Sequence, residues 1–379
     1  MANTTGVTEV SQGTGVAVAE RVAPAHPLWL SSLPSIRRTP IGDLLPQLLD
    51  GAELEPLTEP IAAPVVTIAS TLATGHGPVS DMAVSPDGRF LVTAHYGADV
   101  VCVIDAATLS VTATVDGLSE PYAAVVVKDR AYVSAASNEL DAVVAVDTRT
   151  AVPLAAKTFE LTAGGLAVSP AADVLYVART GDEVVDIAAV DIETGEVTAI
   201  AIPAAPGTSV EALRISADGN RLFAALTTPT GGMLAIIDPN GRAVAQLVPV
   251  AGSIGDVAVM PNGRTVFATG TDVESGGAIH VIDVIGARVT DTIEMGGVPT
   301  GVVLGRGGKC AYIVDRNEIA VLCTATTEIV DSFVIGPQLS CLAADPVRQR
   351  LYAADFAGVI TALRLQPATQ RAPLAAAAS

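Results

Sequence analysis

The sequence predicts an all-β fold, a seven-bladed β-propeller of four-stranded antiparallel blades, and three observations lead to it. A unit of roughly 44 residues recurs seven times between about residues 65 and 366. Each copy carries a complete or degenerate Ser-Pro-Asp-Gly turn followed by an apolar run, as at residues 85–94. An aspartate ends the third apolar run in five copies, at Asp105, Asp147, Asp191, Asp238 and Asp283. Short repeats of this length with four strands each are typical of propeller blades.

The first copy shows how one unit forms four strands. Its predicted strands a, b, c and d are residues 79–85, 90–94, 100–105 and 111–116. β-branched residues dominate the strands, while Pro, Asp and Gly occupy the turns between them. The other copies repeat this order, with the last two the most degenerate.

The seventh copy lacks a fourth strand. After residues 363–367 the chain becomes Ala-rich, whereas a strand-like segment at residues 64–72 precedes the first copy and is similar to its d strand. We therefore expect this N-terminal strand to complete the last blade. Closing the ring in this way removes the exposed sheet edges that an open array would leave.

One position in strand b supports this register. Six of its seven residues are aromatic, although the chain has only 6 Tyr, 6 Phe and 1 Trp. The column reads Val92, Tyr132, Tyr176, Phe223, Phe267, Tyr312 and Tyr352. We expect these side chains to pack between blades. The five repeated aspartates are expected to cap the turn between strands c and d by hydrogen bonds to backbone N–H groups.

The expected domain organisation has three parts. Residues 1–62 form an extension, partly disordered, whose apolar segments at 26–34 and 41–51 pack on the propeller or dock onto another protein. Residues 63–367 form the propeller, and residues 368–379 an Ala-rich flexible tail. No segment approaches the ~20 apolar residues of a membrane helix, and the N-terminus lacks signal-peptide features, so we expect a cytoplasmic protein without a membrane partner.

Charge and cysteine content restrict the partners. The net charge of −19 repels phosphate backbones, disfavours nucleic acid and favours cationic partners. The four cysteines match no zinc pattern and are expected to be small buried thiols in a reducing compartment. Cys310 and Cys323 are expected to lie opposite each other on neighbouring strands. No cofactor or metal is predicted, because no phosphate loop, nucleophile motif or metal-ligand spacing is present.

Two units resemble the YVTN family of seven-bladed β-propellers. They are SPDGRFLVTAHYGADVVCVIDAATLSV (residues 85–111) and SPAADVLYVARTGDEVVDIAAVDIETGEV (residues 169–197). The resemblance covers about four-fifths of the chain and implies the fold rather than a function. Residues 75–88 are similar to the opening of a WD repeat, but no unit ends in Trp-Asp. Lactonases of the phosphogluconolactonase type share this fold, yet none of their catalytic sets can be matched here.

Ligands of propellers usually bind at the channel mouth, on the face that carries the d–a and b–c loops. Two columns on that face, directly after strand b and at the start of strand a, hold unlike polar residues. The candidate ligand-binding residues are His76, Asp81, His95, Tyr96, Tyr122, Arg179, Glu211, Asp256, Asp272, Asp315, Arg316 and Asp355. They predict either a polar mouth that converges on one ligand or a solvated loop face that tolerates variation.

Three functions are compatible with these residues. The first is a non-enzymatic binding or scaffold propeller, expected to be a monomer, for a protein or small ligand. The alternative is a lactonase-like hydrolase or isomerase, with His95 and either Asp355 or Asp315 as an acid–base pair. Asp355 is the more economical partner because blades seven and one are adjacent. Single-stranded nucleic-acid binding is least favoured, since it needs a basic groove with stacking aromatics.

Overall fold

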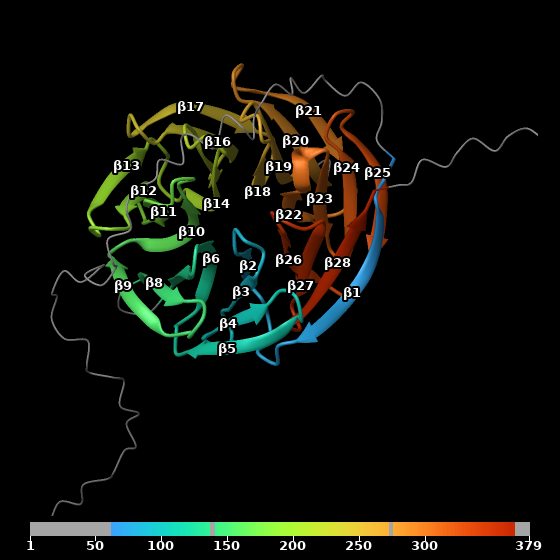
Figure 1. Cartoon of the computed structure of the whole chain (residues 1–379). Coiled ribbons are helices and arrows are strands. Elements are labelled where there is room, and N and C mark those ends of the chain that lie inside the picture. The colour runs from blue at the N-terminus through green and yellow to red at the C-terminus, as the bar shows by residue number, and fades with distance from the viewer. Residues whose placement is uncertain (1–61, 137–140, 273–275, 368–379) are drawn as a thin grey trace, which may run out of the picture.

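The computed structural model describes residues 62–136, 141–272 and 276–367. Within these residues the chain forms seven antiparallel sheets of four strands each, arranged as a ring around a central axis (Figure 1). The seven-bladed propeller is therefore confirmed. The predicted N-terminal extension and Ala-rich tail lie outside the described residues. No helix in the described part of the chain is long and apolar enough to cross a membrane.

In every blade the strands follow one another from the axis outward. Blade 1 contains β2 (Asp81–Val84), β3 (Phe90–His95), β4 (Val100–Asp105) and β5 (Ser110–Asp116). Blade 2 contains β6 (Pro121–Val127), β7 (Arg130–Ala135), β8 (Asp141–Asp147) and β9 (Pro153–Phe159). Blade 3 contains β10 (Thr162–Val168), β11 (Val174–Thr180), β12 (Val185–Asp191) and β13 (Val197–Ile202). Blade 4 contains β14 (Ser209–Ile215), β15 (Leu222–Thr228), β16 (Gly231–Asp238) and β17 (Ala243–Val250).

The last three blades follow the same order. Blade 5 contains β18 (Ser253–Val259), β19 (Thr265–Asp272), β20 (Gly276–Asp283) and β21 (Arg288–Glu294). Blade 6 contains β22 (Pro299–Leu304), β23 (Cys310–Asp315), β24 (Glu318–Cys323) and β25 (Glu328–Val334). Blade 7 contains β26 (Leu339–Ala344), β27 (Arg350–Asp355), β28 (Val359–Gln366) and β1 (Val65–Ala73). A 3₁₀ turn, η2 (Arg306–Gly308), replaces the Ser-Pro-Asp-Gly turn of blade 6.

Ring closure occurs as predicted. Strand β1 pairs antiparallel with β28 from Val65 opposite Gln366 to Ala73 opposite Val359, with one irregularity between Ile68 and Ser70. In Figure 1 this strand, coloured blue, runs along the outer edge of the red last blade. The two ends of the propeller are thus joined within one sheet, so the N-terminal strand is a structural part of blade 7.

The aromatic column packs between blades, as expected from its register. All seven side chains of the column are at least 94% buried. Tyr132 of blade 2, for example, lies in one cluster with Leu166 and Leu175 of blade 3. Each member points from its own blade toward the next, so the seven form a ring of large side chains that set the blade spacing.

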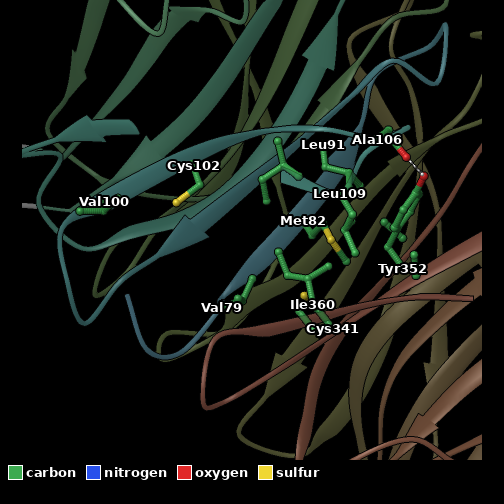
Figure 2. Packing of buried hydrophobic residues seen from close by; sticks show 14 residues of the cluster. Val79, Met82, Leu91, Val100, Cys102, Ala106, Leu109, Cys341, Tyr352 and Ile360 are labelled. Atoms are coloured by element: carbon green, nitrogen blue, oxygen red, sulfur yellow. Dashed lines mark hydrogen bonds between the residues drawn. The ribbon is translucent and has the colours of Figure 1, made fainter. Parts of the chain in front are cut away.

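The seam between blades 7 and 1 combines apolar packing with hydrogen bonds. Figure 2 shows Tyr352 against Leu91 and Leu109, with its hydroxyl donating to the Ala106 carbonyl at 3.4 Å. The Arg350 guanidinium donates to the same carbonyl at 3.1 Å. These contacts join residues about 245 positions apart, and they stabilise the closed ring at its junction.

The repeated aspartates cap the c–d turns, as predicted. In blade 3, Asp191 Oδ1 accepts hydrogen bonds from the N–H groups of Glu193 at 2.9 Å and Thr194 at 2.7 Å. The same arrangement recurs at the ends of β4, β8 and β16, and one such bond forms at the end of β20. The Thr194 N–H holds the pKa of Asp191 below its ordinary value, because that donor stabilises the ionised carboxylate.

Candidate ligand site in the central channel

A cavity of about 550 Å³ lies on the ring axis. The inner strands of all seven blades contribute to its wall, because successive inner strands stand side by side around the axis. The charged and aromatic residues among those that line it are Asp81, Tyr122, Glu211, Arg214 and Asp256. Hydroxyl groups from Ser80, Thr300 and Ser340 and the thiol of Cys341 complete the polar wall.

Asp256 connects three blades across this wall. Its Oδ1 accepts from the Val257 N–H at 2.8 Å and from Arg214 Nη2 at 2.7 Å, an ion pair with blade 4. Its Oδ2 accepts from the Val302 N–H of blade 6 at 3.1 Å. The carboxylate therefore links neighbouring inner strands through hydrogen bonds, and it also places a charge on the channel wall. The Asp256 side chain is 17% exposed and the Arg214 side chain 42%, so water shields the ion pair on the guanidinium side.

Asp81 occupies the equivalent position in blade 1 and likewise links two neighbouring blades through hydrogen bonds. Its Oδ1 accepts from the Met82 N–H at 2.8 Å, and its Oδ2 accepts from the Ala124 N–H of blade 2 at 2.9 Å. Burial raises the pKa of Asp81; the Ala124 and Met82 N–H groups and the Arg214 charge oppose this, and the Asp256 charge adds to it. Burial has the larger effect, so the Asp81 carboxyl takes up a proton at a higher pH than an exposed aspartate does.

Tyr122 and Glu211 lie on neighbouring parts of the same wall. Tyr122 is the second residue of β6, after Pro121, and is 49% exposed. Burial raises the pKa of its phenol, and the charges of Glu211, Asp81 and Asp256 raise it further. Glu211 accepts a hydrogen bond from the Ser209 hydroxyl. The aromatic ring and the three carboxylates therefore share one electrostatic environment in the channel.

Four of the twelve predicted site residues are thus brought together, namely Asp81, Tyr122, Glu211 and Asp256. The sequence reasoning missed Arg214, which interrupts the otherwise apolar second half of β14. A charged residue within an inner strand was the available signal. Arg214 lies two residues after Ala212, outside the two columns of predicted residues, at a position that is apolar in the other six copies.

The column expected directly after strand b behaves differently. His95 ends β3, Asp315 ends β23 and Asp355 ends β27, so each is the last residue of its strand rather than the first of the loop. Strand pairing continues to the hairpin itself, as with Asp315 opposite Glu318. These three side chains are at least 93% buried and belong to the blades rather than to the open mouth.

His95 is held by protein groups at both ring nitrogens. Nδ1 lies 3.2 Å from the Gly77 carbonyl and Nε2 lies 3.0 Å from the Thr93 hydroxyl. The His76 ring stands edge-on to it with 5.8 Å between centroids. Burial lowers the pKa of His95, and the His76 charge adds to this, because both disfavour the imidazolium form.

Asp355 and Asp315 bond to nearby backbone. Asp355 Oδ1 accepts from the Ala357 N–H at 2.9 Å and the Val359 N–H at 2.8 Å, which caps its own hairpin. Asp315 Oδ1 accepts from the Val298 N–H at 2.8 Å. The acid–base pair expected between His95 and one of these carboxylates would have to replace a hydrogen bond at one of the His95 ring nitrogens.

The remaining candidates lie apart from the channel cavity. Arg179 makes a bidentate ion pair with Asp186 on the neighbouring strand, at 2.8 and 2.7 Å, and stacks over Phe159 at 5.4 Å. Tyr96 is exposed, 45%, and the backbone of Arg316 adopts a positive φ of 58° in the β23–β24 hairpin. Asp272 ends β19.

No group of three or more His, Cys, Asp or Glu side chains within residues 62–136, 141–272 and 276–367 is arranged to hold a metal ion. Among the channel carboxylates, Asp81 and Asp256 bond to backbone N–H groups and to one guanidinium, and Glu211 bonds to the Ser209 hydroxyl. Their chemistry is that of hydrogen-bond acceptors around the channel cavity.

Comparisons with known proteins agree with this architecture. A WD domain, G-beta repeat model matches residues 68–102, which span most of β1, all of β2 and β3 and the first part of β4. The match thus includes residues from strands of two blades, the closing strand of blade 7 and the first three strands of blade 1. It contains residues 75–88, the stretch that is similar to the opening of a WD repeat.

A relative in sequence defines the family. The seven-bladed beta-propeller protein Rv1057 of Mycobacterium tuberculosis is 30% identical over 324 residues, covering 75% of this chain and 81% of the relative. The chain belongs to the family of this seven-bladed propeller protein.

Two solved structures show the same fold at low identity. Hydrazine synthase of Kuenenia stuttgartiensis aligns with a TM-score of 0.67 at 20% identity, over 78% of this chain and 98% of that chain. The Cps50 (Swd1) β-propeller domain of Myceliophteria thermophila aligns with a TM-score of 0.65 at 16% identity, over 79% and 99%. At these identities the likeness concerns the fold alone.

Proposed function

We propose that this protein is a non-enzymatic binding propeller whose central channel receives a cationic group. The group is an ammonium or guanidinium, carried by a small ligand or by a Lys or Arg side chain of a protein partner. The observation that carries the proposal is the channel wall, where Asp81, Glu211 and Asp256 face a cavity of about 550 Å³ with Arg214 as its one cation. The wall therefore has an excess of negative charge.

The phenol of Tyr122 responds to this charge. After burial, which is the largest cause, the charges of Glu211, Asp81 and Asp256 raise its pKa. At Tyr122 the field in the channel thus disfavours further negative charge and favours a cation. The Arg214 charge acts the other way at Asp81, but Asp256 and the Leu213 carbonyl already accept hydrogen bonds from this guanidinium.

The ring of Tyr122 supports the same ligand class. It is half exposed on the channel wall, and an aromatic face attracts ammonium and guanidinium groups. The net charge of the whole chain, −19, adds long-range attraction for a cationic partner. Nucleic acid is disfavoured by that same charge, as the sequence alone predicts.

Family membership is compatible with a binding role. The M. tuberculosis relative is named as a seven-bladed β-propeller protein. The YVTN resemblance likewise implies a fold without an activity. A hydrolase or isomerase stays a prediction, and no observation favours it, since hydrogen bonds within the protein engage His95, Asp315 and Asp355. A cytoplasmic, monomeric protein also stays a prediction.

A thermal-shift screen of the full-length protein tests the proposal. The panel contains cations (arginine amide, agmatine, spermidine), neutral sugars and lactones, and anions (citrate, sugar phosphates). A ligand at 100 times its dissociation constant adds about 2.7 kcal/mol of stability, so a genuine ligand gives a clear shift. We expect shifts from members of the cationic group only.

Two variants show whether the channel is responsible. Glu211→Gln retains the side-chain shape and removes one channel charge, so it should weaken the cation-induced shift. Glu328→Gln, on the outer strand β25, removes the same charge outside the channel and should leave the shift unchanged. Stabilisation by anions instead of cations, or equal shifts in both variants and the wild type, would refute the proposed site.

A further inference from the structure

Cys310 and Cys323 stand directly opposite each other in blade 6. Cys310 begins β23 and Cys323 ends β24, and the two are register partners in this antiparallel pair. They lie at the end of the blade away from the β23–β24 hairpin, so they are on the face opposite the channel mouth. The pair is therefore independent of the proposed ligand site, and this register was expected from the sequence.

The hydrogen-bond pattern shows which kind of pair this is. The next pair outward, Lys309 and Thr324, is joined by a backbone hydrogen bond from the Thr324 N–H to the Lys309 carbonyl at 3.1 Å. Because hydrogen-bonded and non-hydrogen-bonded pairs alternate along an antiparallel ladder, Cys310 and Cys323 form a non-hydrogen-bonded pair. Such pairs have Cα atoms about 4.5 Å apart, within the roughly 4.4–6.8 Å that a disulfide spans.

Both side chains point to the same side of the sheet. Directly opposite residues share a face, and Tyr312 and Val321, two residues inward on each strand, pack against blade 7. Cys310 packs at the margin of this same cluster and is partly exposed, whereas Cys323 is fully buried. An oxidant from solvent therefore reaches Cys310 first, with Cys323 placed as the resolving thiol.

We propose that Cys310 and Cys323 are a site of oxidative modification, at which a peroxide or a small disulfide converts the two thiols into a cross-strand disulfide. With hydrogen peroxide, the Cys310 sulfur is oxidised to a sulfenic acid and one water leaves. The Cys323 sulfur then attacks it, forming the S–S bond and releasing a second water. Two thiols are oxidised and one peroxide is reduced to two waters.

The surroundings of Cys310 determine the rate of this oxidation. Burial raises its pKa, the neighbouring Cys323 raises it further, and the Lys309 charge opposes both. Because the thiolate is the reactive form, we expect oxidation to be slow near neutral pH and faster as pH rises. The site therefore responds to sustained oxidising conditions rather than to brief peroxide exposure.

Thiol counting after oxidation tests the inference. The fully reduced full-length protein is treated with excess hydrogen peroxide at pH 8.5, denatured and alkylated with N-ethylmaleimide. The chain has four cysteines, and we expect two of them to escape alkylation. Digestion with trypsin and a glutamate-specific protease cleaves after Lys309, Arg316 and Glu328, so Cys310, Cys323 and Cys341 fall on three different peptides, and a disulfide-linked pair of the first two identifies the bond.

Variants and stability give independent readouts. Cys310→Ser should abolish the linked peptide, whereas Cys102→Ser, a buried thiol in blade 1, should leave it intact. The oxidised wild type should unfold about 3–6 °C higher than the reduced protein, because the bond closes a short loop of the unfolded chain. Four alkylated thiols after oxidation that fully converts free glutathione, or a bond to Cys102 or Cys341, would overturn the inference.

Discussion

Two groups of aspartates in this chain show how the surroundings of a side chain decide its role. At the c–d turns, as at Asp191, the carboxylate accepts from turn N–H groups of its own blade. At the start of β2 and within β18, Asp81 and Asp256 accept from N–H groups of the following blade. The first kind stabilises single blades, and the second joins neighbouring blades while placing charge in the channel.

The turn aspartates predict a pH-dependent contribution to stability. Replacing Asp191 by Ala should lower the free energy of unfolding by about 1 kcal/mol at pH 7, since two backbone N–H groups lose a charged acceptor but remain accessible to water. The folded-state pKa of Asp191 lies below its ordinary value. The stabilisation is thus present above the unfolded-state pKa of about 3.9 and is lost as pH falls through the lower folded-state pKa.

Urea denaturation at pH 7 and at pH 3 measures this difference. Asp191→Asn is the matched control, because its amide oxygen retains an acceptor for the same N–H groups and should lose less stability. A cost for Asp191→Ala that is equally large at both pH values would contradict the assignment of a charged cap.

Residues that repeat were predictable and residues that do not were less so. The aromatic column and the turn aspartates recur in most copies, so their positions and roles follow from the period. His95 and Arg179 occur once each, and their partners Gly77 and Asp186 are set by pairing details that the repeat does not encode. The clustering of Asp81 and Asp256 with Arg214 depends on contacts among blades 1, 4 and 5, which a single sequence leaves open.

At the scale of elements, the outer strand β1 has the largest structural consequence. Its position in blade 7 followed from two observations on the sequence, a missing fourth strand at one end and a spare strand at the other. Its predicted limits of 64–72 compare with Val65–Ala73 in the structure. The short strand β1 pairs with β28 along most of the β1 residues. Because this pairing joins the two ends of the propeller, β1 closes a ring of more than 290 residues.

Deleting residues 63–72 should destabilise the whole propeller. The deletion exposes the backbone edge of β28 and opens blade 7, whose packing against blade 1 includes Tyr352 and Leu91. We expect the thermal midpoint to fall by more than about 10 °C, in line with the loss of several kcal/mol. Scanning calorimetry measures the midpoint, and size-exclusion chromatography detects association through the exposed edge.

Deleting residues 1–50 instead is the control for this experiment. We expect only a mild effect, because the closing strand remains in place. A protein without residues 63–72 that melts at the same temperature as the full chain would show that β1 does not hold the ring closed.

At the scale of the whole molecule, the ring brings seven similar blades to one axis. The few residues that differ among the inner strands therefore lie close together around that axis. The inner strands carry small or apolar residues at most positions, so three carboxylates, one guanidinium and one phenol dominate the chemistry of the channel. The fold was predictable because it rests on what the blades share. The channel site was only partly predictable because it rests on what distinguishes them.

A crystal structure of the full-length protein grown with excess agmatine tests the central claim most directly. Agmatine carries a guanidinium and a primary amine, the two cationic groups proposed. We predict density for one of these groups inside the channel, within hydrogen-bond distance of the Glu211 or Asp81 carboxylate and beside the Tyr122 ring. A channel without agmatine under conditions where the compound stabilises the protein, or an anion bound to Arg214 in its place, would contradict the account.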